Sequence, residues 1–153
     1  MKPNLTLMCG LPRSGKSNWI ANNKKKHEVV VCPDEIRLDL FGHTFHKMAE
    51  PMVWTITEYI IGSLMKQKLD IILDACNMSS ATHKWVDMAR DNDYKTRLVV
   101  IDTPLATCIA RNLKEPKLPI DLLNTFSKCF DVDRLVHPSN NVYDKVIRVR
   151  KNK

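Results

Sequence analysis

Residues 10–17 carry the residue types and spacing with the clearest chemical use in this chain. Their sequence, GLPRSGKS, matches the pattern G-x-x-x-x-G-K-[ST] at every specified position. In such a loop, successive backbone N–H groups and the positive end of the following helix surround an anionic phosphate. An apolar run at residues 5–9 precedes the loop, and residues from Ser17 onward can begin a helix. The pattern therefore predicts a phosphate-binding loop rather than an ordinary strand-to-helix turn.

The polar residues of this loop suit ATP and Mg²⁺. Lys16 is expected to reach the β and γ phosphates, and the Ser17 hydroxyl is expected to ligate Mg²⁺. The loop residues expected to bind the nucleotide are Gly10, Arg13, Ser14, Gly15, Lys16 and Ser17.

A carboxylate and an arginine follow the second apolar run, at residues 29–32. Asp34 and Arg37 are one helical turn apart, so they should lie on one face of a helix. Asp34 could accept the proton of an acceptor hydroxyl, and Arg37 could hold an acceptor phosphate, which would make both catalytic. A helix cap with an ion pair explains the same two residues, and the pattern leaves both interpretations open.

Asp74 ends a third apolar run, at residues 70–74, and Asn77 follows three positions later. An acidic residue at the end of a buried strand near a phosphate loop commonly holds Mg²⁺, directly or through water. We therefore expect Ser17 and Asp74 to be the metal ligands. A turn-forming aspartate is the alternative.

Basic residues lie beside a predicted break in the chain. Pro116 and Pro119 interrupt the segment that holds Arg111, Lys114 and Lys117, which predicts a hinge or lid. Cations placed over transferring phosphates neutralise developing charge. Arg111 is the expected catalytic and nucleotide-binding residue because it precedes the break; a solvated basic loop is the alternative.

These groups need a scaffold that brings them together. Apolar runs predict strands at residues 5–9, 29–32, 70–74, 96–102 and 143–150, and helical spacing predicts helices from 17 and at 34–41, 51–68, 82–90, 104–112 and 119–130. This alternation predicts an α/β, P-loop NTPase fold: a parallel five-stranded sheet flanked by helices, with a lid, in one domain spanning 1–153. Ligands bind beyond the carboxyl ends of such strands, where the phosphate loop, the Asp34–Arg37 pair and the Asp74–Asn77 turn all fall.

Finer expectations concern helix caps and core packing. Asp34 and a serine at 79 or 80 are expected to cap their helices. Trp54 and Tyr59, on the long helix, are expected to pack in the core.

Composition sets broad limits on function. The chain has 153 residues, 44% apolar and 27% charged, and a net charge of +7, which suits a globular domain with a polyanionic partner. Its five cysteines form no C-x-x-C pair, so we expect them to be reduced thiols. No carboxylate or cysteine completes a metal site with His43 and His46, so we expect these histidines to lie in a solvated loop. Because no signal peptide or membrane-spanning segment is recognised, we expect a cytoplasmic protein without a membrane partner.

Taken together, the motifs resemble the kinase domain of bacteriophage-type polynucleotide 5′-hydroxyl kinases. The resemblance covers nearly the whole chain and rests on the loop, Asp34-Glu35-Ile36-Arg37, the Asp74-x-x-Asn77 turn, Arg111-Asn112 and Pro119-Ile120-Asp121. Members transfer the γ-phosphate of ATP to the 5′-hydroxyl of DNA or RNA. The resemblance implies that Lys16 and Ser17 serve ATP and Mg²⁺, that Asp34 is the general base, that Arg37 holds the acceptor's phosphate and that Arg111 is the first lid arginine.

Two positions depart from the pattern of that family. Glu115 stands where a second lid arginine is usual, so Lys114 or Lys117 must compensate or activity is weakened. Arg13 replaces a usual glycine, and its bulky cation either narrows the nucleotide site or favours it electrostatically. The phosphatase domain of the phage enzyme is not recognised after the closing strand, so no 3′-phosphatase activity is expected.

Three functions remain open at this point. The first is ATP-dependent phosphorylation of 5′-hydroxyl ends of single-stranded DNA or RNA in a repair pathway. The second is a kinase of the same fold acting on a nucleoside or another small metabolite. The third is a nucleotide-binding module whose catalysis Arg13 and Glu115 have weakened. The sequence also leaves open the choice between DNA and RNA, the nucleotide donor and a homo-oligomeric state.

Overall fold

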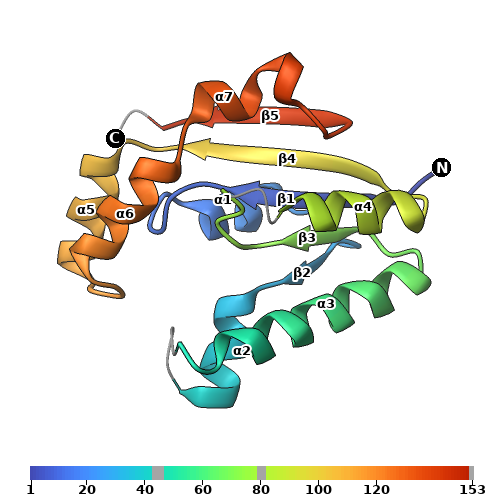
Figure 1. The fold of residues 1–153 in the computed structure, drawn as a ribbon, viewed down its shortest axis with the longest axis horizontal. Helices are drawn as coiled ribbons and strands as arrows, with labels where there is room; N and C mark the ends of the chain where they lie inside the picture. Colours follow the sequence, from blue (N-terminus) through green and yellow to red (C-terminus); the bar gives the residue numbers. More distant parts are fainter. Residues whose placement is uncertain (43–46, 79–81, 152–153) are drawn as a thin grey trace.

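A five-stranded, entirely parallel sheet forms the centre of the computed structural model, which describes residues 1–42, 47–78 and 82–151 (Figure 1). The strand order is β2-β3-β1-β4-β5. The strands are β1 (Asn4–Cys9), β2 (Val29–Val31), β3 (Ile71–Leu73), β4 (Lys95–Asp102) and β5 (Lys145–Arg150). The predicted α/β fold with a parallel five-stranded sheet is therefore confirmed.

Helices connect the strands along the whole chain. They are α1 (Lys16–Asn23), α2 (Pro33–Phe41), α3 (Glu50–Lys66), α4 (His83–Asp91), α5 (Leu105–Lys114), α6 (Ile120–Cys129) and α7 (Val132–Val136), followed by a 3-10 turn at Pro138–Asn140. The sequence predicted every helix except α7 and this turn, which are too short to show a clear period. No helix within the described residues is long and apolar enough to cross a membrane.

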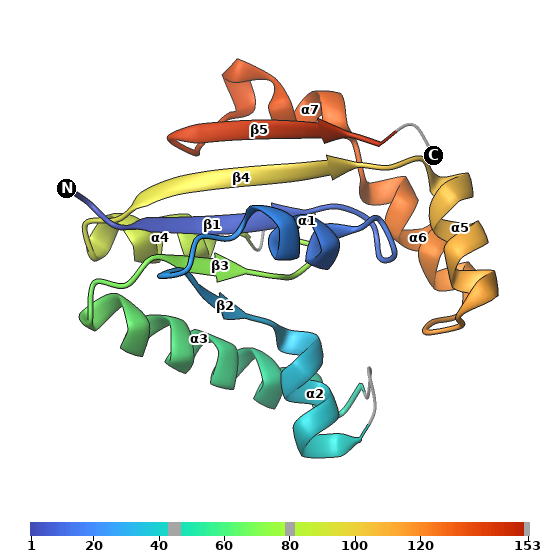
Figure 2. The ribbon, with the colours of Figure 1, turned by 180° about the vertical axis from the view of Figure 1, so that it is seen from behind.

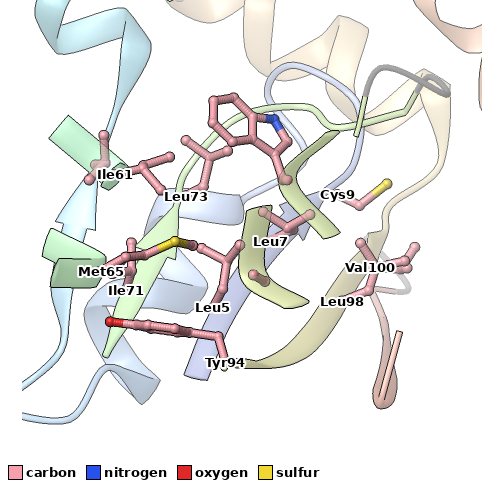
Figure 3. Close-up of a cluster of buried hydrophobic side chains, with 13 residues drawn as sticks. Leu5, Leu7, Cys9, Ile61, Met65, Ile71, Leu73, Tyr94, Leu98 and Val100 are labelled. Atoms are coloured by element: carbon pink, nitrogen blue, oxygen red, sulfur yellow. The ribbon is translucent and has the colours of Figure 1, made fainter. Parts of the chain in front are cut away.

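Alternation along the strands divides the core between the two faces of the sheet. Leu5, Leu7 and Cys9 of β1 belong to the larger cluster, where they join Ile61 of α3 (Figure 3). Trp85 of α4 belongs to the same cluster. Partly buried residues of α7 pack against the same cluster. On the opposite face, buried apolar residues of β1, β3 and β4 pack against α1. Residues pointing to opposite faces thus fasten β1 between two helical layers.

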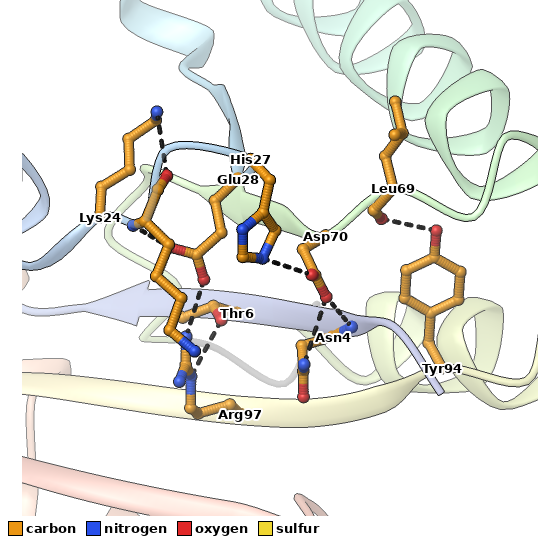
Figure 4. Close-up of polar contacts among 10 residues, drawn as sticks. Asn4, Thr6, Lys24, His27, Glu28, Leu69, Asp70, Tyr94 and Arg97 are labelled. Atoms are coloured by element: carbon orange, nitrogen blue, oxygen red, sulfur yellow. Dashed lines mark hydrogen bonds and ion pairs between the residues drawn. The ribbon is translucent and has the colours of Figure 1, made fainter. Parts of the chain in front are cut away.

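Polar contacts, rather than another helix, hold part of the α1 face together (Figure 4). Arg97 donates to the Thr6 hydroxyl at 3.1 Å and pairs with the buried Glu28 at 3.2 Å. Nearby, Asp70 accepts a hydrogen bond from the backbone N–H of Asn4 at 2.6 Å. These contacts join the starts of the strands, at the edge opposite the phosphate loop.

Three helices gather at the carboxyl edge of the sheet. Figures 1 and 2 show α2 beyond the end of β2, and α5 with α6 beyond the end of β4. Leu11 of the loop packs with Cys108 of α5 and Leu123 of α6 in a third apolar cluster. The phosphate loop and the predicted lid helices are therefore parts of one packed unit.

Some finer expectations were wrong. Cys32, in extended conformation, occupies the N-cap position of α2, because Pro33 begins the helix and Asp34 lies within its first turn. Thr82 occupies the N-cap position of α4. Tyr59 is 76% exposed, whereas Trp54 packs against the core as expected. The serines at 79 and 80, with His43 and His46, lie outside the described residues.

Candidate functional site

Close packing explains the first glycine of the phosphate loop. A Cβ atom on Gly10 would lie 2.8 Å from Ser14 Oγ and 2.9 Å from the backbone oxygen of Ile101 in β4. Gly15, with φ of 102°, is the N-cap of α1 and occupies a conformation that side chains disfavour. The loop therefore brings its backbone close to β4 and turns sharply into the start of α1.

Lys16 lies back over the start of the loop. Its ammonium group donates to the carbonyl oxygens of Gly10 at 3.1 Å and Leu11 at 2.8 Å, and approaches Cys76 Sγ at 3.6 Å. Burial raises the pKa of the Cys76 thiol, despite the opposing charge of Lys16. The sulfur beside Lys16 is therefore a neutral thiol.

The two predicted metal ligands are in direct contact. Ser17, in the first turn of α1, donates its hydroxyl to Asp74 Oδ2 at 2.7 Å, and Asp74 directly follows β3. The described residues contain no group of three or more His, Cys, Asp or Glu side chains that could hold a metal ion. One carboxylate and one hydroxyl suit Mg²⁺, which takes few protein ligands and completes its shell with phosphate oxygens and water.

Asp34 and Arg37 form the expected pair, and a third residue joins them. Arg37 Nη1 donates to Asp34 Oδ1 at 2.6 Å. Its Nε and Nη2 atoms donate to the two carboxylate oxygens of Glu50, at 2.7 and 2.8 Å. The indole nitrogen of Trp54 adds a 3.2 Å hydrogen bond to Glu50. Glu50 begins α3 and lies 13 residues from Arg37, and no local sequence pattern points to it.

The charges of this cluster reinforce one another. Burial acts against the charge of Arg37, but the hydrogen bonds and charges of Glu50 and Asp34 outweigh it and raise the pKa of Arg37. The hydrogen bond from Arg37 lowers the pKa of Glu50 despite partial burial. Arg37 is 12% exposed and Glu50 20%, whereas the Asp34 side chain is 68% exposed. The carboxylate at position 34 is therefore the open end of an otherwise enclosed ionic cluster.

Strand order determines how these groups are spaced. Because β3 lies between β2 and β1, the strand ends that carry Asp34 and the loop are about 10 Å apart. The two strands β1 and β2 are not neighbours in the sheet. Asp34 would lie directly beside the loop only if they were. Asp74, at the end of β3, stands between them.

Helix α5, part of the predicted lid, is joined to the loop through two arginines. Arg111 Nη1 donates to the backbone oxygen of Arg13 at 3.0 Å, and Arg13 Nη2 donates to the backbone oxygen of Arg111 at 3.3 Å. Arg13 also pairs with Glu115 at 3.5 Å. The two positions that depart from the family pattern are thus partners in space.

The other predicted lid cations differ in their surroundings. Lys117 pairs with Glu115 at 3.6 Å, and Lys114 is exposed. Neither contacts the loop within the described residues. Asn112, which is 2% exposed, shapes the turn instead: its amide donates to Leu118 O at 2.7 Å and its oxygen accepts from Lys117 N at 3.1 Å.

Asn77 stabilises the backbone between β3 and β1. Its side chain donates to the backbone oxygen of Met8 at 2.7 Å and so joins the segment after β3 to β1. Its positive φ of 48° suits asparagine.

Two buried polar atoms of the phosphate loop lack partners within the protein. Ser14 Oγ and Arg13 Nε are both shielded from solvent, and neither has a hydrogen-bond partner among the described residues. Buried polar atoms without partners are costly in a folded protein, and a polar ligand is one explanation for them. The close approach at Gly10 and the contact of Ser17 with Asp74 agree with the same ligand.

A family model described as an AAA domain matches residues 5–116. The chain belongs to this family. The matched part of this AAA domain contains the loop, the Asp34 cluster, Asp74 and the lid residues up to Pro116. No curated protein matches the chain in sequence.

Solved structures support the same fold for this AAA domain. A chain of the Pnkp1/Rnl/Hen1 complex matches with a TM-score of 0.67 and 20% identity, over 99% of this chain and 47% of that one. A chain of the PezAT toxin-antitoxin system of Streptococcus pneumoniae matches with a TM-score of 0.73 and 12% identity, over 98% of this chain and 69% of that one. The structure of APS kinase CysC of Mycobacterium tuberculosis in complex with AMPPNP and APS matches with a TM-score of 0.58 and 16% identity, over 99% of this chain and 90% of that one.

These likenesses show the fold of P-loop kinases. The present AAA domain spans about half the length of the chain from the Pnkp1/Rnl/Hen1 complex, with 47% of that chain covered.

Proposed function

We propose that this protein is an ATP-dependent kinase that transfers the γ-phosphate to a 5′-hydroxyl end of DNA or RNA. One observation carries the proposal: an exposed carboxylate, Asp34, lies at the same edge of the sheet as the phosphate loop, and Asp74, the partner of Ser17, lies between them. A kinase needs a phosphate cradle, a metal-binding pair and a base for the acceptor hydroxyl. The three groups fit these tasks in that order across the sheet.

In this proposal, the chain's own residues hold and orient the reactants. Backbone N–H groups of the loop and Lys16 would hold the phosphates, Ser17 and Asp74 would hold Mg²⁺, and Arg111 would neutralise charge from the lid side. Magnesium-bound ATP, when present, supplies the phosphoryl group to be transferred. The Asp34 carboxylate would accept the hydroxyl proton of the acceptor.

The contacts of Arg37 change its proposed role. Three of its N–H groups already serve Asp34 and Glu50, so we propose that Arg37 orients the Asp34 carboxylate as well as facing the acceptor. A guanidinium has five donors, which leaves two for an acceptor phosphate. Arg37 is thus primarily a positioning residue in this account.

Two further observations favour a nucleic acid as the acceptor. The motifs of the chain resemble those of polynucleotide kinases, and a chain of the Pnkp1/Rnl/Hen1 complex shares the fold over 99% of this chain. The net charge of +7 would also attract a polyanion.

A panel of acceptors with γ-labelled ATP tests the proposal. We expect label on 5′-hydroxyl oligonucleotides of DNA or RNA, and none on the same oligonucleotides with a 5′-phosphate. Transfer only to free nucleosides, unaffected by salt or by competing single-stranded DNA, would contradict it.

A second candidate function is phosphorylation of a small hydroxyl compound. The extensive pairing of Arg37 favours it, because an acceptor without a phosphate would not need those donors. Free nucleosides and 3′-mononucleotides in the same panel distinguish the two functions. ATP binding without transfer to any acceptor would instead indicate a binding module.

A further inference from the structure

Arg13 occupies an unusual position for a charged side chain. It lies inside the phosphate loop with φ of 67°, and its side chain is only 18% exposed. The guanidinium reaches the last turn of α5, where one nitrogen contacts the backbone oxygen of Arg111 and the Glu115 carboxylate. Its Nε atom is shielded from solvent without a partner among the described residues. The guanidinium thus has donor capacity that its present contacts leave unused.

Glu115 holds Arg13 weakly. Their atoms are 3.5 Å apart, and the Glu115 side chain is 70% exposed and also faces Lys117. Ion pairs this open to water contribute little and are screened by salt. A polyphosphate offers more charge and paired oxygens to which a guanidinium binds in a bidentate manner. Arg13 can therefore leave Glu115 for a stronger anion.

We infer that Arg13 is a triphosphate-binding residue and that Glu115 is its counter-ion when no nucleotide is bound. This inference rests on the proposed nucleotide site, and it adds a residue, Glu115, that regulates nucleotide affinity. In the family that the chain resembles, a second lid arginine stands at the position of Glu115. Here Arg13 of the loop supplies that second guanidinium beside Arg111. Nucleotide binding then requires Arg13 to exchange a carboxylate for phosphate, so Glu115 competes with the nucleotide.

A double-mutant cycle in the full chain tests this exchange. Glu115→Gln removes the competing charge and keeps the size of the side chain. Arg13→Gly removes the guanidinium at a backbone conformation that glycine readily adopts, which favours a folded variant. Asp121→Asn is a control for charge, since Asp121 is exposed on α6 and has no contact with Arg13 in the described part of the chain. Titrations with AMPPNP and Mg²⁺ at low salt measure the affinity of each variant.

We expect Glu115→Gln to tighten AMPPNP binding about fivefold and Arg13→Gly to weaken it about tenfold. In the Arg13→Gly background, Glu115→Gln should change nothing, and Asp121→Asn should have no effect in either background. The effect of Glu115→Gln should shrink as salt rises.

Equal tightening by Glu115→Gln with and without Arg13 would overturn the inference, because Glu115 would then act on the nucleotide directly. So would an unchanged affinity in Glu115→Gln. Lys16→Ala keeps the two proposals separable: binding that depends on Lys16 but shows no Arg13–Glu115 coupling refutes the exchange alone. No Lys16-dependent binding by the wild type refutes the proposed nucleotide site as well.

Discussion

Arg37 directs three of its N–H groups to carboxylates, and Glu50 accepts two of them. Such a partly buried pair is costly to break from one side, because the remaining charge loses its partner in a poorly hydrated place. Trp54 supports the cluster with its indole hydrogen bond to Glu50 and with its ring, whose centroid is 5.7 Å from the Arg37 guanidinium carbon. At the scale of single residues, Glu50 therefore decides how firmly Arg37 and Asp34 are held.

Glu50→Gln should lower the free energy of unfolding by about 1–3 kcal/mol at pH 7, less than for a fully buried pair because both partners have some exposure. The pKa of Glu50 is lowered from its ordinary value of 4.5, so its charge stabilises the folded state above pH 4.5. That stabilisation is lost as the pH falls through the folded-state pKa.

Urea unfolding of both proteins between about pH 7 and 3 measures this loss. The difference between wild type and Glu50→Gln should shrink toward the acid end. A difference that stays constant with pH would contradict the ionic role of Glu50.

Local patterns pointed to some residues of the candidate site and missed others for a clear reason. Lys16, Ser17 and Asp74 were predictable because each is set by a motif or a strand end nearby in the sequence. Glu50 was not, because its contact with Arg37 depends on the path of the chain between α2 and α3. The pairing of Arg13 with Glu115 spans 102 residues, so the sequence showed two separate departures and not their contact.

At the scale of elements, the phosphate loop depends on its close approach to β4. The oxygen of Ile101 belongs to the backbone of a central strand and cannot easily move away from a new Cβ. Gly62, on α3, is different, since its Cβ would meet only the terminal methyl of Met88 at 3.2 Å. The same substitution should therefore have opposite consequences at the two positions.

Gly10→Ala should weaken nucleotide binding at least about tenfold and destabilise the protein by about 1–3 kcal/mol, because the loop must shift. Gly62→Ala, the matched control, should be neutral or stabilising by up to about 1 kcal/mol, since alanine favours the helix. Thermal melts and AMPPNP titrations measure both. Unchanged binding in Gly10→Ala would show that the close approach at this glycine is not needed.

The turn after α5 depends on Asn112 in a similar way. Asn112→Ala would leave the oxygen of Leu118 and the N–H of Lys117 without their partner, which should cost about 1–3 kcal/mol. Trypsin should then cut faster at Lys114 and Lys117. Asn124→Ala on α6 is the control, because that side chain makes no hydrogen bond within the described residues. Equal cleavage of the two variants would argue against a role for Asn112 in shaping the turn.

At the scale of the whole molecule, the parallel sheet was predictable because strand and helix alternate along the chain. The strand order was not, since sequence periodicity says which residues form strands and not which strands become neighbours. That order sets the distance between Asp34 and the loop and puts Asp74 between them. The short helix α7 was also missed, because five residues carry too little periodicity.

The net charge of +7 also acts at this scale. For an oligonucleotide acceptor, kcat/KM should fall with salt, with a log–log slope of about −2 if three phosphates are contacted. A nucleoside acceptor, which has no phosphate, should show a much flatter dependence. Parallel slopes for the two acceptors would mean that the charge does not guide the substrate.

The central claim is that the loop at residues 10–17 presents a phosphoryl group to a hydroxyl activated by Asp34. The most direct measurement is label transfer from γ-labelled ATP to a 5′-hydroxyl oligonucleotide by wild type and Asp34→Asn, with AMPPNP affinity measured on the same samples. The account predicts that Asp34→Asn lowers transfer by about 10²–10⁴-fold and leaves AMPPNP affinity within about twofold of wild type. Transfer by Asp34→Asn at the wild-type rate would contradict it.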